Sequence, residues 1–274
     1  MRSGEPVSTP IKIAAVQMVS TPEPADNKAT VERRVREAAD AGASLVLLPE
    51  YWPLLGRTEH DKLHHAETPG QGPLQDFMAR IARDAGVWLL GGTVPLVSGV
   101  PGKVLNTLLA YDPQGQACAR YDKIHLFGFS RGEESFDESR TIVPGNDVCV
   151  LETPFARIGL SICYDLRFPE LYRAMGACDL IVMPAAFTYT TGRAHWEVLL
   201  RARAIENQCH VLAAAQGGVH PNGRRTWGHS MLVDPWGEIC ASLPEGEGLV
   251  MGELDLGRQS SVRESLPALA HRTR

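Results

Sequence analysis

The sequence predicts an α/β protein in which strands and helices alternate, built from two similar halves. Short apolar runs of strand length alternate with amphipathic stretches of helix length, and several of the predicted helices end at a glycine. In addition, ADAGASLVLLPE (39–50) and RAMGACDLIVMPA (173–185) share one plan: a helix end, a glycine, an apolar strand and a proline. We therefore expect two half-domains packed face to face, with their strand ends meeting at a common crevice.

The first half of the chain is predicted to alternate between strands and helices before a hairpin. The apolar and amphipathic patterns favour strands at 11–18, 44–48 and 87–94, and helices at 26–41 and 73–85. Asp112-Pro113-Gln114-Gly115 is typical of a turn, and it joins predicted strands at 105–111 and 117–124. A polar loop is expected over 127–145.

The second half repeats this alternation. Strands are predicted at 157–163, 180–183 and 211–215, with helices at 170–175 and 194–207. A second hairpin turns at Asp234-Pro235-Trp236-Gly237, and the tail beyond Leu256 is polar and weakly patterned. Because no Gly/Ser-rich or Pro-rich linker interrupts the chain, we expect a single domain over 1–274, with its core at about 11–255 and its tail at 256–274.

Composition excludes several classes of partner and site. The net charge of -5 argues against nucleic acid as a partner. The six cysteines form no CxxC pair, so a zinc site or redox dithiol is not indicated, and scattered thiols are typical of a reducing cytoplasm. The first ten residues, MRSGEPVSTP, do not have the apolar centre of a signal peptide, and no apolar run reaches the roughly 20 residues needed to span a membrane. We expect a cytoplasmic protein without a membrane partner.

The stretch RIGLSICYDLRFPE (157–170) is predicted to place Cys163 where a strand turns towards a helix. Its first half alternates with period two, and Pro169 suits the first turn of a helix. At such a turn a cysteine can serve as a nucleophile, and the backbone N–H of Tyr164 can stabilise an oxyanion. The alternative is a small buried core residue, which describes most free cysteines.

Glu50 and Lys123 are charged residues beside apolar strands. Glu50 follows LVLLP, and Lys123 stands in YDKIHLF at the end of a predicted strand. A charge at such a place is solvated, paired or functional. Considered singly, each is more simply explained as a member of a surface ion pair.

Taken together, Glu50, Lys123 and Cys163 resemble the glutamate–lysine–cysteine triad of the nitrilase, or carbon–nitrogen hydrolase, superfamily. The resemblance spans Ile11 to about Asp255 and rests on six segments in order: LVLLPE, YDKIHLF, FDESRTIVPG, GLSICYDLRFPE, GRAHWEVLLRARAIENQ and WGHSMLVDPWGE. It implies a four-layer α-β-β-α sandwich that acts on small amides without metal or organic cofactor. It also implies a homodimer or higher homo-oligomer, paired through the helical face that follows the nucleophile.

The resemblance assigns a role to each residue of the triad. Cys163 would be the nucleophile, Glu50 the general base and acid, and Lys123 the cation at the oxyanion beside the N–H of Tyr164. Glu138 matches a second glutamate that supports the site. On physical grounds we expect Lys123 to favour the thiolate of Cys163, while Glu50 accepts its proton during attack.

Three other functions are less well supported by the sequence: a metal-dependent hydrolase, a cysteine–histidine enzyme and a catalytically silent scaffold. His60, His64 and His65 crowd together, but they have no third ligand or HExxH pattern, so a solvated loop is favoured over the site of a metal-dependent hydrolase. A cysteine–histidine arrangement would need a histidine near Cys163, for which the sequence offers His125, His195 and His229. A catalytically silent scaffold would be favoured by a missing triad residue, and none is missing.

For the substrate, the run 186–218 resembles the branch of the superfamily that cleaves deaminated glutathione, and resembles the omega-amidase branch less. Both branches cleave an amide at the far end of a 2-oxo acid. The predicted handle for that carboxylate is Arg167 or Arg193, because a guanidinium can bind a carboxylate through two parallel bonds. Tyr189 and Thr191 are predicted to line the pocket. A second carboxylate handle is expected in the 127–145 loop, from Arg131 and Arg140.

Overall fold

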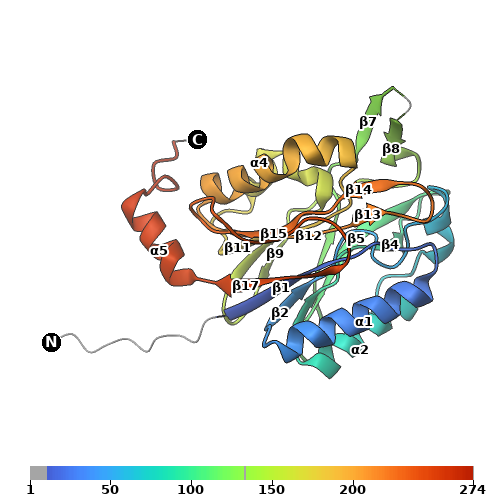
Figure 1. Ribbon diagram of the computed structural model, residues 1–274, viewed down its shortest axis with the longest axis horizontal. Helices are drawn as coiled ribbons and strands as arrows, with labels where there is room; N and C mark the ends of the chain where they lie inside the picture. Colours follow the sequence, from blue (N-terminus) through green and yellow to red (C-terminus); the bar gives the residue numbers. More distant parts are fainter. Residues whose placement is uncertain (1–10, 133, 274) are drawn as a thin grey trace.

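Two β-sheets packed face to face form the centre of the molecule, and helices cover the outer face of each sheet (Figure 1). This arrangement is seen in a computed structural model, which describes residues 11–132 and 134–273. The first ten residues, where the sequence predicts no signal peptide, lie outside that description. The layer order is helix, sheet, sheet, helix, so the predicted α-β-β-α sandwich is confirmed.

The first sheet has the strand order β17-β1-β2-β3-β5-β4, with β6 paired to β5. Its central strands β1, β2 and β3 are parallel, and β17 and β5 flank them in the antiparallel sense. Helices α1 (Pro24–Asp40) and α2 (Pro73–Ala85) cover its outer face. The strands are β1 (Ile11–Gln17), β2 (Leu45–Leu47), β3 (Trp88–Leu90), β4 (Val94–Val97), β5 (Val104–Tyr111), β6 (Ala117–Asp122) and β17 (Gly248–Leu254).

The second sheet, ordered β16-β15-β12-β11-β10-β9, repeats this plan. Strands β10, β11 and β12 are parallel, and β9 and β15 flank them in the antiparallel sense. Helix α4 (Tyr189–Asn207) lies on its outer face, with the short α3 (Pro169–Ala174) beside it. The strands are β9 (Val150–Glu152), β10 (Arg157–Leu160), β11 (Leu180–Ala185), β12 (His210–Ala215), β15 (Ser230–Val233) and β16 (Ile239–Leu243). The two halves are therefore similar, as the shared plan of segments 39–50 and 173–185 predicts.

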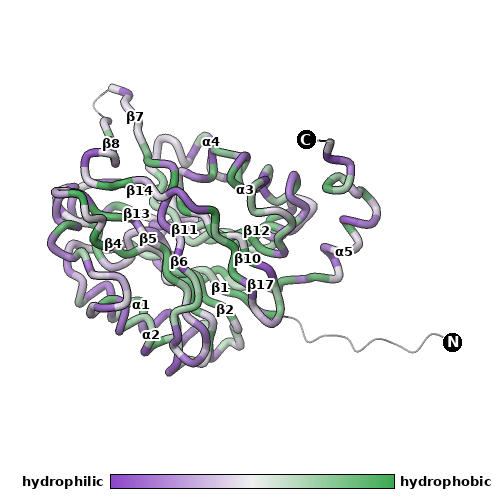
Figure 2. Tube along the Cα trace, turned by 180° about the vertical axis from the view of Figure 1, so that it is seen from behind, coloured by the Kyte–Doolittle hydropathy of each residue, from purple (hydrophilic) through white to green (hydrophobic). Residues whose placement is uncertain are grey.

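Two small hairpins stand at one end of the sandwich. They are β7–β8 (Gly128–Arg131 and Glu134–Asp137) and β13–β14 (Gly217–Val219 and Arg225–Trp227). Figures 1 and 2 both show β8 close to β13–β14, and β7–β8 projects from the body of the molecule. No helix among the described residues is both long and apolar enough to cross a membrane.

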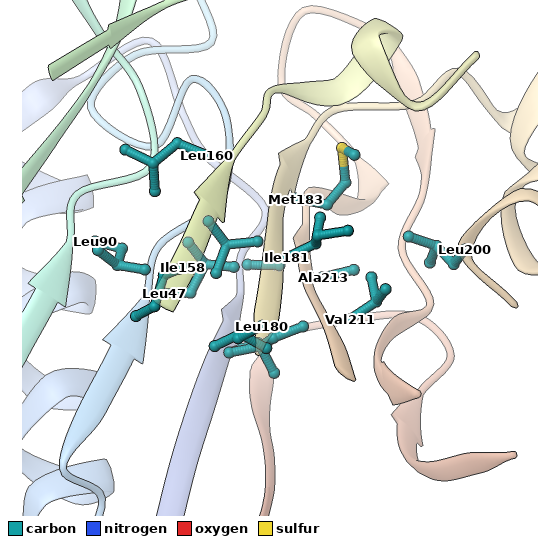
Figure 3. Packing of buried hydrophobic residues seen from close by; sticks show 14 of the residues in the cluster. Leu47, Leu90, Ile158, Leu160, Leu180, Ile181, Met183, Leu200, Val211 and Ala213 are labelled. Carbon is teal, nitrogen blue, oxygen red and sulfur yellow. The ribbon is translucent and has the colours of Figure 1, made fainter. Parts of the chain in front are cut away.

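The apolar core lies in two layers. One cluster fills the space between the sheets and reaches the inner face of α4, and the other lies between the first sheet and α1 and α2. Figure 3 shows Leu47 and Leu90 of the first sheet facing Ile158, while Leu200 of α4 faces Val211. Strands β2 and β11 are buried at every position, and both are apolar along their length.

Several predicted boundaries are wrong, and the causes are local. Helix α4 begins at Tyr189 rather than at residue 194, because the side chain of Thr188 accepts a bond from the N–H of Thr191 and so caps the helix five residues earlier. The predicted strand 87–94 breaks after Leu90, because Gly92 has a left-handed φ of 55° and approaches the backbone of Pro49 too closely for any side chain.

Two segments predicted to be irregular are ordered. The polar 127–145 loop contains the β7–β8 hairpin and a 3₁₀ turn, η2 (Glu138–Arg140). The polar tail contains helix α5 (Leu256–Ser265), which is capped by Asp255 and is nearly all polar outside its two buried positions. The sequence did not predict these elements because their apolar residues show only a weak periodic pattern.

Candidate active site

The structure brings Glu50, Lys123 and Cys163 from separate strand ends to one place. Glu50 follows β2, Lys123 follows β6 and Cys163 follows β10, so both sheets contribute. Glu50 and Cys163 line the same hollow, and Lys123 lies buried beside Glu50. The hollow is lined by Glu50, Phe127, Glu138, Cys163, Tyr164, Ala186, Phe187, Thr188, Thr191 and Arg224.

Lys123 is fully buried between two carboxylates. Its Nζ lies 2.8 Å from Oε1 of Glu50, and 3.0 and 2.8 Å from the two carboxylate oxygens of Glu138. Each glutamate is itself fixed by other donors. Glu50 accepts bonds from the side chain of Asn106 at 3.0 Å and from the N–H of Ala186 at 2.9 Å. Glu138 likewise accepts from the Tyr51 hydroxyl and the Phe127 N–H, both at 2.7 Å.

These contacts favour the charged forms of Lys123 and Glu138. Burial alone would lower the pKa of Lys123, but the carboxylates of Glu138 and Glu50 outweigh it and raise that pKa. Burial would raise the pKa of Glu138, but the ammonium of Lys123 outweighs it and lowers that pKa. With two carboxylates around one ammonium, the cluster carries a net negative charge next to Cys163.

The pKa of the Cys163 thiol is raised well above its ordinary value, first by burial and then by the nearby Glu50 carboxylate, although Lys123 acts in the opposite direction. Lys123 therefore favours the thiolate as expected, but burial and the Glu50 carboxylate outweigh it in the free site. The nucleophile rests as a thiol, and a base must take its proton during attack.

Cys163 stands on a strained turn rather than on the strand. Strand β10 ends at Leu160, and Cys163 opens a 3₁₀ helix, η3 (Cys163–Arg167), with a left-handed φ of 48°. A non-glycine residue in this conformation is costly unless its surroundings hold it, and such residues cluster at functional sites. As the second residue of η3, Tyr164 has an N–H without an intrahelical partner, which suits the predicted oxyanion role.

A buried carboxylate that we did not single out, Asp165, holds this turn in place. Its Oδ2 accepts bonds from the N–H of Ile162 at 2.9 Å and the hydroxyl of Tyr121 at 2.7 Å. Its Oδ1 accepts bonds from the backbone N–H and the ring Nδ1 of His125, at 3.0 and 2.7 Å. Asp165 thus ties the Cys163 turn to the segment that carries Lys123. Its signal was an acid just past an apolar strand, the same signal that pointed to Glu50.

The predicted substrate residues fall into two groups. Thr191 lines the hollow, and its hydroxyl lies 2.8 Å from that of Thr188. Arg167 lies close by, with its guanidinium 5.6 Å from the Tyr164 ring centroid and 5.4 Å from that of Phe187.

Tyr189 and Arg193 lie outside the hollow lining. Tyr189 packs against Trp227 instead, and Arg193 is exposed within α4 rather than in a loop before it.

Arg131 and Arg140 do not provide the second handle at this hollow. Both are exposed, and the Nε of Arg140 lies 3.9 Å from a carboxylate oxygen of Asp137. The cation that does line the hollow is Arg224, which sequence reasoning missed. It stands in the turn that leads into β14, where GRR resembles an ordinary exposed polar turn.

The histidines contribute no alternative site in the described part of the chain. His60, His64 and His65 are exposed, and no cluster of three or more potential metal ligands is found among the residues that the structure describes. His125 is bonded to Asp165, His195 contacts Arg167 and His229 contacts the carbonyl of Trp227. None of these last three lines the hollow.

Comparison with known sequences identifies relatives along nearly the whole chain. Residues 12–264 match the carbon–nitrogen hydrolase family. A deaminated glutathione amidase from Yersinia enterocolitica is 42% identical over 94% of this chain and 92% of its own length. A human omega-amidase is 36% identical over 94% of each chain.

Solved structures agree with these relatives. Nit3 of Saccharomyces cerevisiae, a member of branch 10 of the nitrilase superfamily, superposes with a TM-score of 0.86 at 28% identity, covering 100% of both chains. A mutant amidase from Nesterenkonia, with acrylamide added to its active-site cysteine, gives a TM-score of 0.78 at 27% identity. That match covers 94% of this chain and 98% of the other.

The Asp165 contacts generate a prediction. Every group around the carboxylate is a donor, so Asp165→Asn would place an NH₂ group against donors and leave at least one of them unpaired. We expect the free energy of unfolding to fall by about 2–3 kcal/mol, and kcat to fall more than KM changes, because the Cys163 turn loses its support. Denaturant unfolding and steady-state kinetics measure the two effects.

The matched control is Asp147→Asn, at an exposed position, which should change neither quantity. An Asp165→Asn protein with unaltered stability and kcat would show that this carboxylate does not hold the turn.

Proposed function

This chain belongs to the carbon–nitrogen hydrolase family, and on that premise we propose that it hydrolyses deaminated glutathione to 2-oxoglutarate and Cys-Gly. It is an enzyme that acts on amides. The observation that carries the proposal is the buried Glu50–Lys123–Glu138 cluster beside Cys163, in a hollow that is lined by Arg224 and has Arg167 close by.

In the first step, Sγ of Cys163 attacks the amide carbonyl carbon. Because the thiol is protonated at rest, Glu50 takes its proton as the C–S bond forms. The carbonyl oxygen becomes an oxyanion, and it is stabilised by the ammonium of Lys123 and the N–H of Tyr164. Lys123 is held by two carboxylates before the substrate arrives, so it does not need to reorganise.

The second step breaks the C–N bond. Glu50 returns its proton to the leaving nitrogen, the amine Cys-Gly departs, and the 2-oxoglutaryl group stays on Cys163 as a thioester. Glu50, again a carboxylate, takes a proton from water, whose oxygen attacks the thioester carbon. Collapse of this second intermediate releases 2-oxoglutarate and returns the proton to the sulfur. Glu138 takes no proton in this sequence, and it positions Lys123.

The acyl end of the substrate carries a 2-oxo carboxylate, and Arg167 is our proposed handle for it. The guanidinium lies beside Tyr164 and Phe187, two walls of the hollow, and its side-chain hydrogen bond runs to the His195 ring at 3.2 Å. No carboxylate oxygen of the described residues lies within ion-pair distance of it. Arg193 is not retained in this role because it is exposed on α4.

The alternative is an omega-amidase that acts on 2-oxoglutaramate or 2-oxosuccinamate. The similarity to the human omega-amidase supports this alternative. The same triad serves both reactions, since only the leaving amine differs. A second cation in the hollow, Arg224, favours the substrate with a second carboxylate.

We also propose a homodimer in the cytoplasm. All six cysteines are free thiols, which fits a reducing compartment. On the outer side of α4, Val198 and Ile205 are 68% and 49% exposed, and nearby Trp236 is 53% exposed. Exposed apolar groups gathered in this way are typical of an interface between subunits.

The roles within the triad can be tested by substitution. Cys163→Ala should lower kcat by at least about 1,000-fold while the protein stays folded, since a residue that works within a catalytic unit removes nearly all of the acceleration. Cys178→Ala, at another buried cysteine, is the control and should keep kcat. Mass spectrometry during turnover should find the acyl adduct on Cys163. Normal kcat in Cys163→Ala would refute this mechanism.

The substrate is tested by comparing two amides on one preparation of the enzyme. We expect a higher kcat/KM for deaminated glutathione than for 2-oxoglutaramate, because the former offers a second carboxylate and a larger leaving group. Equal or reversed values would favour the omega-amidase reaction and would leave the triad unaffected.

The dimer is tested by sedimentation velocity. The wild-type protein should sediment as a dimer, and Val198→Arg should shift it towards the monomer, because a charge would be buried in the interface. Val219→Arg, at a residue equally exposed on β13, should remain a dimer. A wild-type monomer at micromolar concentration would contradict the proposal.

A further inference from the structure

Arg224 is a half-buried cation whose hydrogen-bonding capacity is only partly used by the protein. Its Nη2 donates to the carbonyl of Ala186 at 3.1 Å, and its guanidinium carbon lies 5.2 Å from the ring centroid of Phe136. Among the described residues, its buried Nε has no hydrogen-bond partner. No described carboxylate oxygen lies within 4.0 Å of the guanidinium, in contrast to its neighbour Arg225, which pairs with Glu245 at 3.0 Å.

The backbone around Arg224 is held firmly. Its N–H donates to the side-chain oxygen of Asn222 at 2.9 Å, and Asn222 in turn donates to the carbonyl of Gly56 at 2.6 Å. Its own carbonyl accepts a bond from the N–H of His220 at 2.8 Å. A guanidinium fixed in this way loses little conformational freedom when it binds an anion.

The position of Arg224 relates it to the leaving group. Ala186 accepts from Arg224 through its carbonyl and donates to Oε2 of Glu50 through its N–H, so one lining residue contacts both side chains. In the proposed reaction Glu50 delivers its proton to the leaving nitrogen. Arg167 lies beside two other lining residues, Tyr164 and Phe187.

Arg224 also lines a second hollow. Lys62 also lines it, but the Nζ of Lys62 lies 2.7 Å from a carboxylate oxygen of Glu59 and its charge is already paired. The cation met there without a carboxylate partner is Arg224.

We propose that Arg224 binds the terminal carboxylate of the leaving peptide and thereby selects amides that carry a negative charge on both sides of the scissile bond. This inference rests on the proposed function and adds to it a residue that determines specificity. With Arg167 at one end and Arg224 at the other, the enzyme would recognise a substrate with two carboxylates, and 2-oxoglutaramate would satisfy only the first.

The test compares wild type, Arg224→Gln and Arg224→Lys on three amides. These are deaminated glutathione, the same compound with its glycine carboxylate replaced by a carboxamide, and 2-oxoglutaramate. A charged hydrogen bond of this kind predicts a loss in kcat/KM of roughly 10- to 100-fold for deaminated glutathione in Arg224→Gln, mainly through KM. Arg224→Lys should lose less, because the charge remains and the two-pronged geometry is lost.

The other two substrates report whether the effect lies at the carboxylate. In Arg224→Gln, kcat/KM for 2-oxoglutaramate should stay within about threefold of wild type, which also shows that the protein is folded. The carboxamide compound should be poor for wild type and no poorer for Arg224→Gln. Arg225→Gln, at the neighbouring exposed position, is the matched control and should leave all three values unchanged.

An equal loss on all three substrates would overturn the inference, because it would place Arg224 at the acyl end or in a purely structural role. No loss on any of them would overturn it as well. A wild-type enzyme without preference for deaminated glutathione would instead contradict the proposed function, so the two failures can be told apart.

Discussion

The rest of the site depends on the burial of one ammonium group between two carboxylates. Lys123 has no exposed surface, and losing one partner of such a buried pair typically costs about 3–5 kcal/mol. Its bonds to Glu50 and Glu138 therefore fix the end of β2, the end of β6 and the η2 turn relative to one another. The same ion pairs therefore serve catalysis and the fold, because Lys123, the cation that would stabilise an oxyanion, also joins these three segments.

The sequence shows the parts of the site that follow directly from apolar strands. Glu50, Lys123 and Cys163 each stand next to such a strand, and the two sheets repeat one parallel arrangement, so the crevice between strand ends was predictable. Their convergence also depends on the family resemblance, because spacing along the chain does not say which strand ends meet.

Contacts between distant segments were not predictable. Arg224 belongs to a polar turn, and its importance comes from Ala186 and Phe136, which lie far from it in the sequence. Arg131 and Arg140 have the same chemistry but do not line the hollow, and nothing in the sequence shows that the β7–β8 hairpin and the η2 turn leave them exposed. The start of α4 was misplaced because a single capping threonine determines it, and a periodic apolar pattern does not reveal a cap.

The protonated state of the Cys163 thiol affects how readily peroxide oxidises it. Peroxide attacks the thiolate and prefers accessible sulfur, so susceptibility follows ionisation and exposure. Cys163 is 7% exposed, and burial together with Glu50 raises its pKa, so little thiolate is present at neutral pH. We therefore expect Cys163 to form sulfenic acid slowly in the free enzyme, and to become reactive only when an amide is bound and Glu50 takes its proton.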